Sequence, residues 1–233
     1  MHSFFSQIFS IFFSSNCLSC DENLRHFGFC QSCWRNLEPR SGYRCKVCDA
    51  SIRGPVFNSR CGQCLDKAPP FDKVHGLFDY SGPVGDAIRH GKYRDCPRAI
   101  SMVAKLCSLA IRDRIEIATS MTIVPIPSHW IRVTRQQFEP TLIIAHTLSR
   151  ELKLPINKSL LKRVVYTMPQ AGMNAVDRLK NMNGAFRATG ESPKRVLLVD
   201  DVYTTGATTK SATRTLKQAG AREVQIVAAA YVT

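Results

Sequence analysis

Two adjacent carboxylates and a hydroxyl-rich loop stand together in the segment VLLVDDVYTTGAT, residues 196–208. The apolar run that opens it is typical of a strand buried on both faces of a parallel sheet. Asp200 and Asp201 follow directly, and ligands of open α/β sheets bind outside the carboxyl ends of the strands. The pattern therefore predicts a polar ligand that the two carboxylates contact.

The loop after the acid pair has the composition of a phosphate site. Its small side chains let backbone N–H groups approach a phosphate, and the helix that follows adds the positive end of its dipole. Two carboxylates suit two vicinal hydroxyls, directly or through a metal ion, so a ribose 5-phosphate fits the segment. An isolated acid pair more often caps a turn, but here strand, acid pair and loop occur together. The loop residues are Thr204, Thr205, Gly206, Ala207 and Thr208.

Eight of the ten cysteines precede residue 65, in four C-x-x-C pairs. Repeated pairs at this spacing are typical of zinc knuckles, in which two turns supply four thiolates. Disulfides in a secreted protein are the alternative. Glycines in the short spacers favour ribbon turns rather than helices. We predict two structural zinc sites from consecutive pairs, with interleaved pairing left open: Cys17, Cys20, Cys30 and Cys33 form one, and Cys45, Cys48, Cys61 and Cys64 the other.

Length and charge limit the remaining interpretations. The 233 residues suffice for one full domain and a small accessory one, and Ala68–Pro70 is a plausible junction. The formal net charge of +14 indicates an anionic partner, the alternative being a basic protein that is merely soluble. The start, MHSFFSQIFSIFFSS, lacks the basic region and cleavage site of a signal peptide and is too short to span a bilayer. We expect it to form an amphipathic helix packed on a cytoplasmic protein, with peripheral contact at the inner membrane as the minority interpretation.

Strand and helix patterns alternate after the junction, which predicts a parallel sheet covered by helices. We expect strands over 74–80, 121–127, 195–201 and 223–233, and helices over 83–93, 98–115, 140–154 and 208–220.

The segment VLLVDDVYTTGAT resembles the phosphoribosyl pyrophosphate (PRPP) motif of type I phosphoribosyltransferases. Together with four upstream cysteine pairs it resembles the ComF family, the competence-associated proteins of bacterial natural transformation; Lys92 in RHGKY is a further matching position. The resemblance implies an α/β type I phosphoribosyltransferase fold with a hood over 69–233, after an amino-terminal helix and double zinc ribbon over 1–68. It implies that catalytic Asp200 and Asp201 hold the ribose hydroxyls directly or through Mg²⁺.

The same resemblance implies that the loop 204–208 wraps the 5-phosphate and that Arg132 and Arg135 face the pyrophosphate. The chain departs from the family pattern just beyond, where relatives commonly read RGFNQ and residues 136–140 read QQFEP. A second departure concerns Thr204, because hypoxanthine-guanine transferases carry a carboxylate base at this place. A neutral hydroxyl does not take a proton from a purine nitrogen at neutral pH. Hypoxanthine-guanine salvage is therefore not expected, and the acceptor is left open.

The resemblance implies a ComF-type competence protein with a PRPP-binding domain, acting in the import of single-stranded DNA, with a competence helicase or inner-membrane DNA channel as candidate partner. The alternative is an orphan phosphoribosyltransferase with an unidentified acceptor and no direct DNA role, and whether turnover occurs is left open. A weaker third hypothesis is a PRPP sensor with a protein-binding zinc module. Rings among cations in the zinc region suit stacking with unpaired bases: Phe27, Phe29, Trp34, Tyr43 and Phe57 lie among Arg25, Arg35, Arg40, Arg44, Lys46, Arg53 and Arg60.

Overall fold

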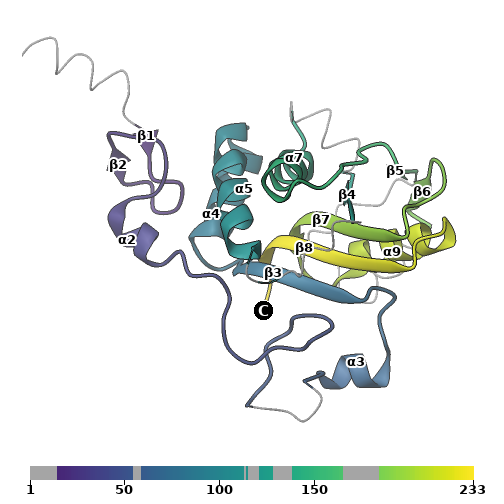
Figure 1. Ribbon diagram of the computed structural model, residues 1–233. Helices are drawn as coiled ribbons and strands as arrows, with labels where there is room; N and C mark the ends of the chain where they lie inside the picture. Colours follow the sequence, from purple (N-terminus) through teal and green to yellow (C-terminus); the bar gives the residue numbers. More distant parts are fainter. Residues whose placement is uncertain (1–14, 55–58, 113, 115–120, 128–137, 165–183) are drawn as a thin grey trace, which may run out of the picture.

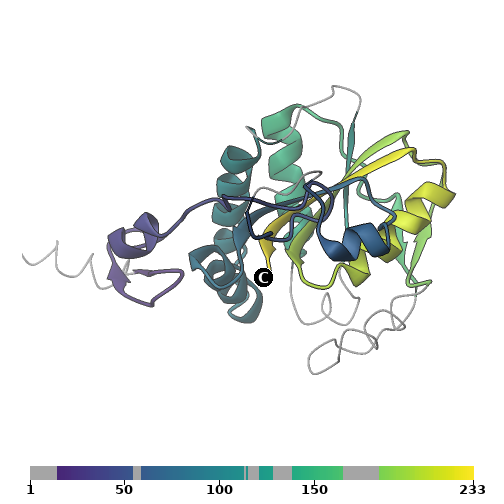
Figure 2. The ribbon, with the colours of Figure 1, turned by 90° about the horizontal axis from the view of Figure 1, so that it is seen from below.

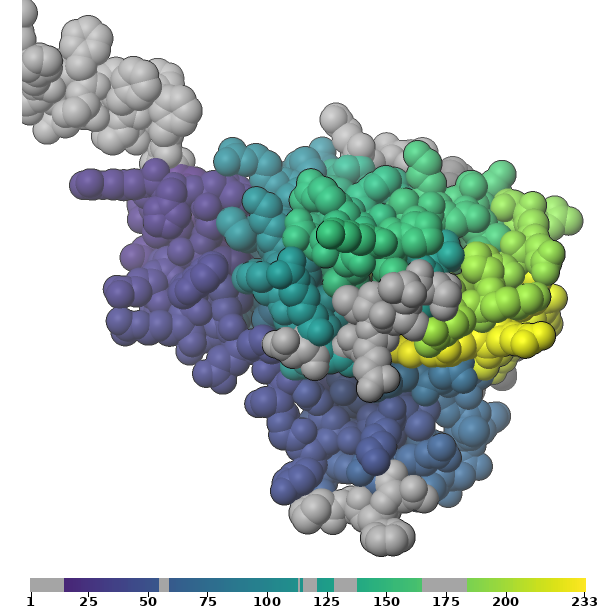
Figure 3. Space-filling view, in the orientation of Figure 1, coloured from purple at the N-terminus to yellow at the C-terminus, as the bar shows by residue number. Residues whose placement is uncertain are grey.

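The computed structural model describes residues 15–54, 59–112, 114, 121–127, 138–164 and 184–233. The helix expected at the amino terminus, and Arg132 and Arg135, fall outside the described residues. Figure 1 shows an α/β body, a first small module beside α4 and α5, and a second module along β3. The space-filling view in Figure 3 shows these two modules as separate lobes of the molecule.

The body is built on a four-stranded parallel sheet in the order β3-β8-β7-β4 (Figure 1). The register pairs Leu198 with Val124 on one side and with Ile226 on the other. The inner strands have neighbours on both edges and helices on both faces, which explains their nearly continuous apolar sequence. All four expected strands are confirmed: β3 is Lys73–Asp79, β4 is Thr122–Pro125, β7 is Arg195–Tyr203 and β8 is Glu223–Tyr231.

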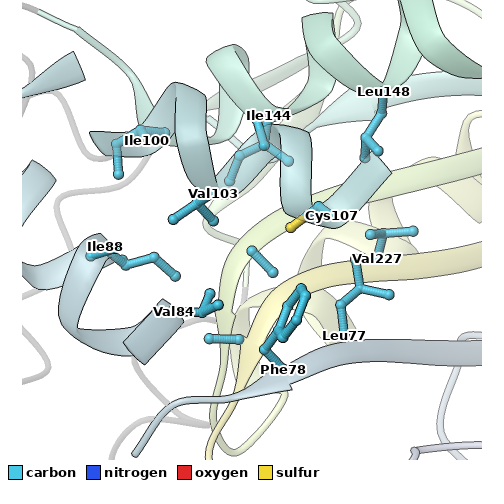
Figure 4. Close-up of a cluster of buried hydrophobic side chains, with 14 of the residues drawn as sticks. Leu77, Phe78, Val84, Ile88, Ile100, Val103, Cys107, Ile144, Leu148 and Val227 are labelled. Carbon is cyan, nitrogen blue, oxygen red and sulfur yellow. The ribbon is translucent and has the colours of Figure 1, made fainter. Parts of the chain in front are cut away.

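Helices cover both faces of this sheet. Along β7, Leu197 and Val199 point into the cluster under α4, α5 and α7, and Val196 and Leu198 into the cluster under α9. Figure 4 shows the first of these clusters. The helices α4, α5 and α7 each begin with a proline, which is favoured there because a backbone N–H in the first turn has no partner within the helix. The four expected helices are confirmed: α4 is Pro83–Tyr93, α5 is Pro97–Ile111, α7 is Pro140–Leu152 and α9 is Ala207–Gln218.

A small antiparallel pair, β5 (Leu161–Arg163) and β6 (Phe186–Ala188), lies beside α9. It brackets residues 165–183, which are outside the described part of the chain. The hood that the resemblance implies falls partly on those residues.

The two cysteine-rich modules contain short helices as well as turns. In the first module β1 (Ser15–Asn16) pairs with β2 (Asn23–Leu24), followed by α2 (Gln31–Arg35), and the second contains α3 (Gly62–Asp66). The expectation of turns rather than helices was wrong for the second cysteine pair of each module. Cys30 is the N-cap of α2, and its sulfur accepts a hydrogen bond from the Cys33 N–H, as a capping side chain does.

Each module attaches to a different part of the body. The first contacts α4 and α5: Asp21 pairs with Arg94, and the Arg98 guanidinium lies 4.4 Å from the centre of the Phe27 ring. The second covers the free edge of β3, where the Val74 N–H donates to the Val47 carbonyl at 2.8 Å. Figure 2, seen from below, shows this module in front of the sheet. Covering an edge strand in this way prevents unwanted pairing with other chains. Among the described helices, none has the length and apolar character needed to span a membrane.

Candidate functional site

The acid pair lies near the carboxyl end of β7, at the edge of the sheet where the sequence predicts a ligand. Asp200 is buried, and the Asp201 N–H donates to its Oδ1 at 2.9 Å. Burial, and then the negative charge of Asp201, raise the pKa of Asp200 to about 7. Ionising the buried Asp200 beside the charge of Asp201 is therefore costly, and a bound cation would lower that cost.

Lys92 supplies one positive charge at this site. It belongs to the last turn of α4, and its Nζ lies 2.6 Å from Asp201 Oδ2. Its charge, with that of Arg163, opposes the rise in the pKa of Asp200. Lys92 is a position that matches the family resemblance, and the sequence alone assigned it no role. Its basic position in the last turn of a helix was the available signal, but it did not point to Asp201.

The predicted phosphate loop connects β7 to α9. Gly206 is the N-cap of α9 with φ +72°, a left-handed conformation that glycine adopts at little cost. The Thr205 hydroxyl oxygen accepts from the Ala207 N–H at 3.4 Å, and the Thr209 hydroxyl donates to the Gly206 carbonyl at 3.0 Å. The loop is thus held by its own side chains at the amino-terminal end of a helix, where N–H groups favour an anion.

A cation of α9 that was not predicted from the sequence contacts this loop. Lys210, in the first turns of α9, donates from its Nζ to the Thr205 carbonyl at 3.4 Å. Thr204 is exposed and Thr208 half-buried, so both side chains remain open to a ligand. The structure therefore brings Asp200, Asp201 and the loop together at one edge, whereas Arg132 and Arg135 lie outside the described residues.

The eight cysteines form two groups of four, and the pairs are consecutive. In each group the four sulfur atoms lie within 4.8 Å of one another. The Sγ–Sγ distance is 3.6 Å from Cys20 to Cys30 and 3.5 Å from Cys48 to Cys61, close to the roughly 3.8 Å that tetrahedral coordination at Zn–S bonds of 2.3 Å requires. No disulfide joins any of the described cysteines.

The protonation of the thiols also fits zinc. Burial raises the pKa of Cys45, but hydrogen bonds from the backbone N–H groups of Cys48 and Cys61 contribute to a larger effect in the opposite direction. The net result is a pKa lowered to about 7. Burial is the main cause that raises the pKa of Cys64 to about 11, and the charge of Cys45 contributes in the same direction. Ionising several of these neighbouring thiols together costs free energy unless a cation neutralises their charge. Sites with four cysteine ligands of this kind are structural zinc sites.

Two family models match different parts of the chain. A family model described as "Double zinc ribbon domain" matches residues 8–67, and one described as "Phosphoribosyl transferase domain" matches residues 142–232. Among solved structures, a purine phosphoribosyltransferase from Pyrococcus horikoshii is 19% identical with a TM-score of 0.31, covering 56% of this chain and 71% of that chain.

Relatives match both parts of the chain at once. "DNA utilization protein YhgH" is 28% identical over 213 residues in Salmonella typhi and over 211 residues in Escherichia coli K12. Each match covers 87% of this chain and 90% of the relative. "Competence protein F" of Haemophilus influenzae is 30% identical over 224 residues, which cover 92% of this chain and 96% of the relative. With this identity along nearly its whole length, the chain belongs to the ComF family of competence protein F.

Proposed function

We propose that the chain binds PRPP with Mg²⁺ at the carboxyl edge of β7 and acts in the uptake of single-stranded DNA during natural transformation. One observation supports this ligand: the buried Asp200, whose pKa is raised to about 7, lies beside Asp201 near the end of β7, and the loop that follows β7 leads into α9. Two relatives are named for competence and for DNA utilization, which supports the DNA role.

Different residues of the site contact different parts of PRPP. Asp200 and Asp201 contact the ribose hydroxyls, and the loop 204–208 surrounds the 5-phosphate with N–H groups and hydroxyls. Carboxylate oxygens are the ligands that Mg²⁺ prefers, so the acid pair suits this ion directly or through the ribose. When bound, Mg²⁺ would neutralise charge on the pyrophosphate. Lys92 holds the Asp201 carboxylate in place, and Arg132 and Arg135 are proposed for the pyrophosphate.

The zinc ribbons are proposed as the DNA-binding part. Trp34 and Tyr43 are 55% and 60% exposed, and rings of this kind stack on unpaired bases. By contrast, Phe29 is buried, and Arg40 is buried in ion pairs with Asp49 and Asp79. The proposed DNA surface therefore excludes Phe29 and Arg40, although both belong to the set of rings and cations in the sequence of this region.

The other assignments are part of the same proposal. The division into residues 1–68 and 69–233 rests on the junction at Ala68–Pro70, and a cytoplasmic location suits the zinc thiolates, with peripheral contact at the inner membrane as the minority interpretation. A competence helicase or inner-membrane DNA channel is the partner that the resemblance implies. An orphan phosphoribosyltransferase without a DNA role is the less favoured alternative, because relatives that match both parts of the chain are named for competence or DNA utilization.

Titration calorimetry of PRPP and Mg²⁺ into zinc-loaded protein tests the ligand. We expect saturable binding that is lost in the Asp200→Asn, Asp201→Asn double variant and kept in Asp95→Asn, a control at an exposed aspartate. Absence of binding to the unaltered protein would contradict the proposal.

A pyrophosphate-release assay on the same samples separates an enzyme from a binding protein. Complementation of a naturally competent bacterium that lacks its own relative tests the DNA role, and full transformation by the double variant would contradict a need for PRPP.

A further inference from the structure

Arg40 is a buried cation between the second zinc site and the central sheet. It is 5% exposed, and its Nε and Nη1 donate to the carboxylates of Asp79 and Asp49 at 2.8 and 2.9 Å. Its guanidinium carbon also lies 4.0 Å from the centre of the Tyr231 ring. A planar guanidinium can stack on a ring and direct hydrogen bonds to the side at the same time, which an ammonium cannot do.

Tyr231 extends this contact to the next strand. Its ring stacks on that of Tyr203, with centroids 5.0 Å apart and planes 14° apart, and the two residues are register partners of β8 and β7. Both tyrosines are buried, and the rings of Phe71 and Tyr203 meet edge to face, with centroids 6.4 Å apart and planes 78° apart. Tyr203 is the last residue of β7, so the phosphate loop begins directly after it.

A glycine stands at each end of the stack. A Cβ on Gly76 would lie 2.8 Å from the Tyr231 ring and 2.9 Å from Arg40 Nη1. A Cβ on Gly206 would press on the Tyr203 hydroxyl oxygen and lie 2.8 Å from the Tyr203 Cζ. A side chain at either position would force neighbouring atoms to move. The backbone at Gly76 and at Gly206 therefore lies close against the stacked side chains. Gly206 belongs to the phosphate loop itself, and the position of Tyr203 therefore limits the position of that loop.

The Arg40 end of the stack is linked to the second zinc site through Asp49. Asp49 follows the ligand Cys48 directly, and its N–H donates to the carbonyl of the ligand Cys45 at 3.0 Å. Its carboxylate accepts hydrogen bonds from Arg40 and, at 3.0 Å, from the Gly76 N–H. An ion that holds both cysteines thereby holds the carboxylate that orients Arg40.

We propose that the second zinc site positions the phosphate loop through Arg40, Tyr231 and Tyr203, and that Arg40 is a positioning residue for the anion site. The first zinc site has no part in this proposal, since the contacts given for the described residues of its module go to α4 and α5. Of these, the Arg98 guanidinium over the Phe27 ring is a pair of the same kind in a different place. It offers a matched control.

PRPP affinity of the full-length, zinc-loaded protein gives the first test, which rests on the proposed function. Arg40→Lys keeps the charge and loses the plane, so the dissociation constant should rise about three- to tenfold, with less than about a twofold change for Arg98→Lys. Tyr231→Phe, which keeps the ring, should retain the affinity of the unaltered protein, and Tyr231→Leu should behave like Arg40→Lys. Equal affinities in all four variants would overturn the proposal.

Hydrogen exchange without ligand gives a second test that does not depend on PRPP. Amide exchange in peptides that cover 204–209 should accelerate about fivefold in Arg40→Lys, while α5 peptides stay unchanged. Cys48→Ser and Cys20→Ser each remove one zinc ligand, and only Cys48→Ser should loosen the loop. Should the unaltered protein fail to bind PRPP, the proposed function falls, and loop exchange still decides the role of the second zinc. An unchanged loop in Arg40→Lys and Cys48→Ser, or an equal acceleration in α5, would overturn it.

Discussion

Lys92 and Asp201 lie far apart in the sequence and meet at the carboxyl edge of the sheet. Their Nζ and Oδ2 atoms are 2.6 Å apart, and the two side chains are only 18% and 13% exposed. A pair this far from water loses more when one partner is removed than a surface pair does, because the remaining charge has little solvent to stabilise it. Lys92 therefore contributes both to the stability of the fold and to the charge of the site.

Replacing Lys92 by glutamine tests this contribution. The free energy of unfolding should fall by about 1 to 3 kcal/mol at pH 7.5, between the values typical of exposed and of buried pairs. Urea unfolding followed by circular dichroism measures it, with Lys105→Gln as control, since Lys105 is an exposed lysine of α5. The same loss in both variants would show that the ion pair with Asp201 contributes nothing.

The raised pKa of Asp200 predicts a pH dependence of stability. An acid whose pKa is higher in the folded than in the unfolded chain binds more protons when folded, so stability falls as the pH rises between the two values. For Asp200 that window runs from about 4 to about 7. Asp200→Asn should therefore be as stable as the unaltered protein near pH 4 and more stable at pH 8, by on the order of 2 to 4 kcal/mol.

Urea unfolding at a series of pH values, with the difference taken between the two proteins, checks this expectation. PRPP and Mg²⁺ should bind the unaltered protein more tightly as the pH rises through 7, because the ionised acid pair is the form that binds a cation. A stability difference that does not vary with pH would show that Asp200 is not titrating in the folded protein.

Gly206 is constrained twice, by its backbone and by its neighbour. Gly206→Ala should lower the free energy of unfolding by about 2 to 4 kcal/mol, since a left-handed alanine is strained and its Cβ would press on the Tyr203 hydroxyl. Gly184 has nearly the same φ, +71° against +72°, with open space around its Cβ. The loss of stability in Gly184→Ala thus measures the cost of backbone strain alone. The difference between the two variants in thermal unfolding then gives the cost of the contact with Tyr203. Equal losses would deny that contact.

Zinc content checks the consecutive pairing of the cysteines. Two substitutions within one group, Cys20→Ser with Cys33→Ser, should leave about one zinc per chain. Two substitutions across the groups, Cys20→Ser with Cys48→Ser, should leave none. Interleaved sites built from the first and third pairs would give the reverse order. Elemental analysis of dialysed protein by mass spectrometry distinguishes the two results.

The sequence predicted what depends on local pattern. The apolar run before Asp200 and the spacing of the cysteine pairs are repeated, short-range signals, so the buried strand and the two metal centres could be inferred directly. The N-cap of α2 by Cys30 was missed, because glycine-rich spacers suggested turns and a cysteine was not considered as a cap.

Contacts between distant segments could not be inferred in the same way. Arg40 reads as one of many cations in a basic region, and only the fold shows it buried on Tyr231 with Asp49 and Asp79 as partners. The pairing of Lys92 with Asp201 likewise depends on where α4 ends relative to β7. In both cases the residue type was visible in the sequence, whereas the partner was set by the packing of elements that a single sequence does not place.

The exposed rings of the zinc ribbons should decide binding of single-stranded DNA. Trp34→Ala and Tyr43→Ala should each weaken binding of a short oligonucleotide by about 1 to 3 kcal/mol, because each removes a stacking surface for one base. Tyr93→Ala is the control, since Tyr93 is 84% exposed but belongs to α4. Fluorescence anisotropy at several salt concentrations measures the affinities, and the salt dependence should be retained in all three variants because the rings carry no charge. Equal affinities for the three variants and the unaltered protein would remove the ribbons from the DNA surface and leave the positive charge of the body to account for any binding.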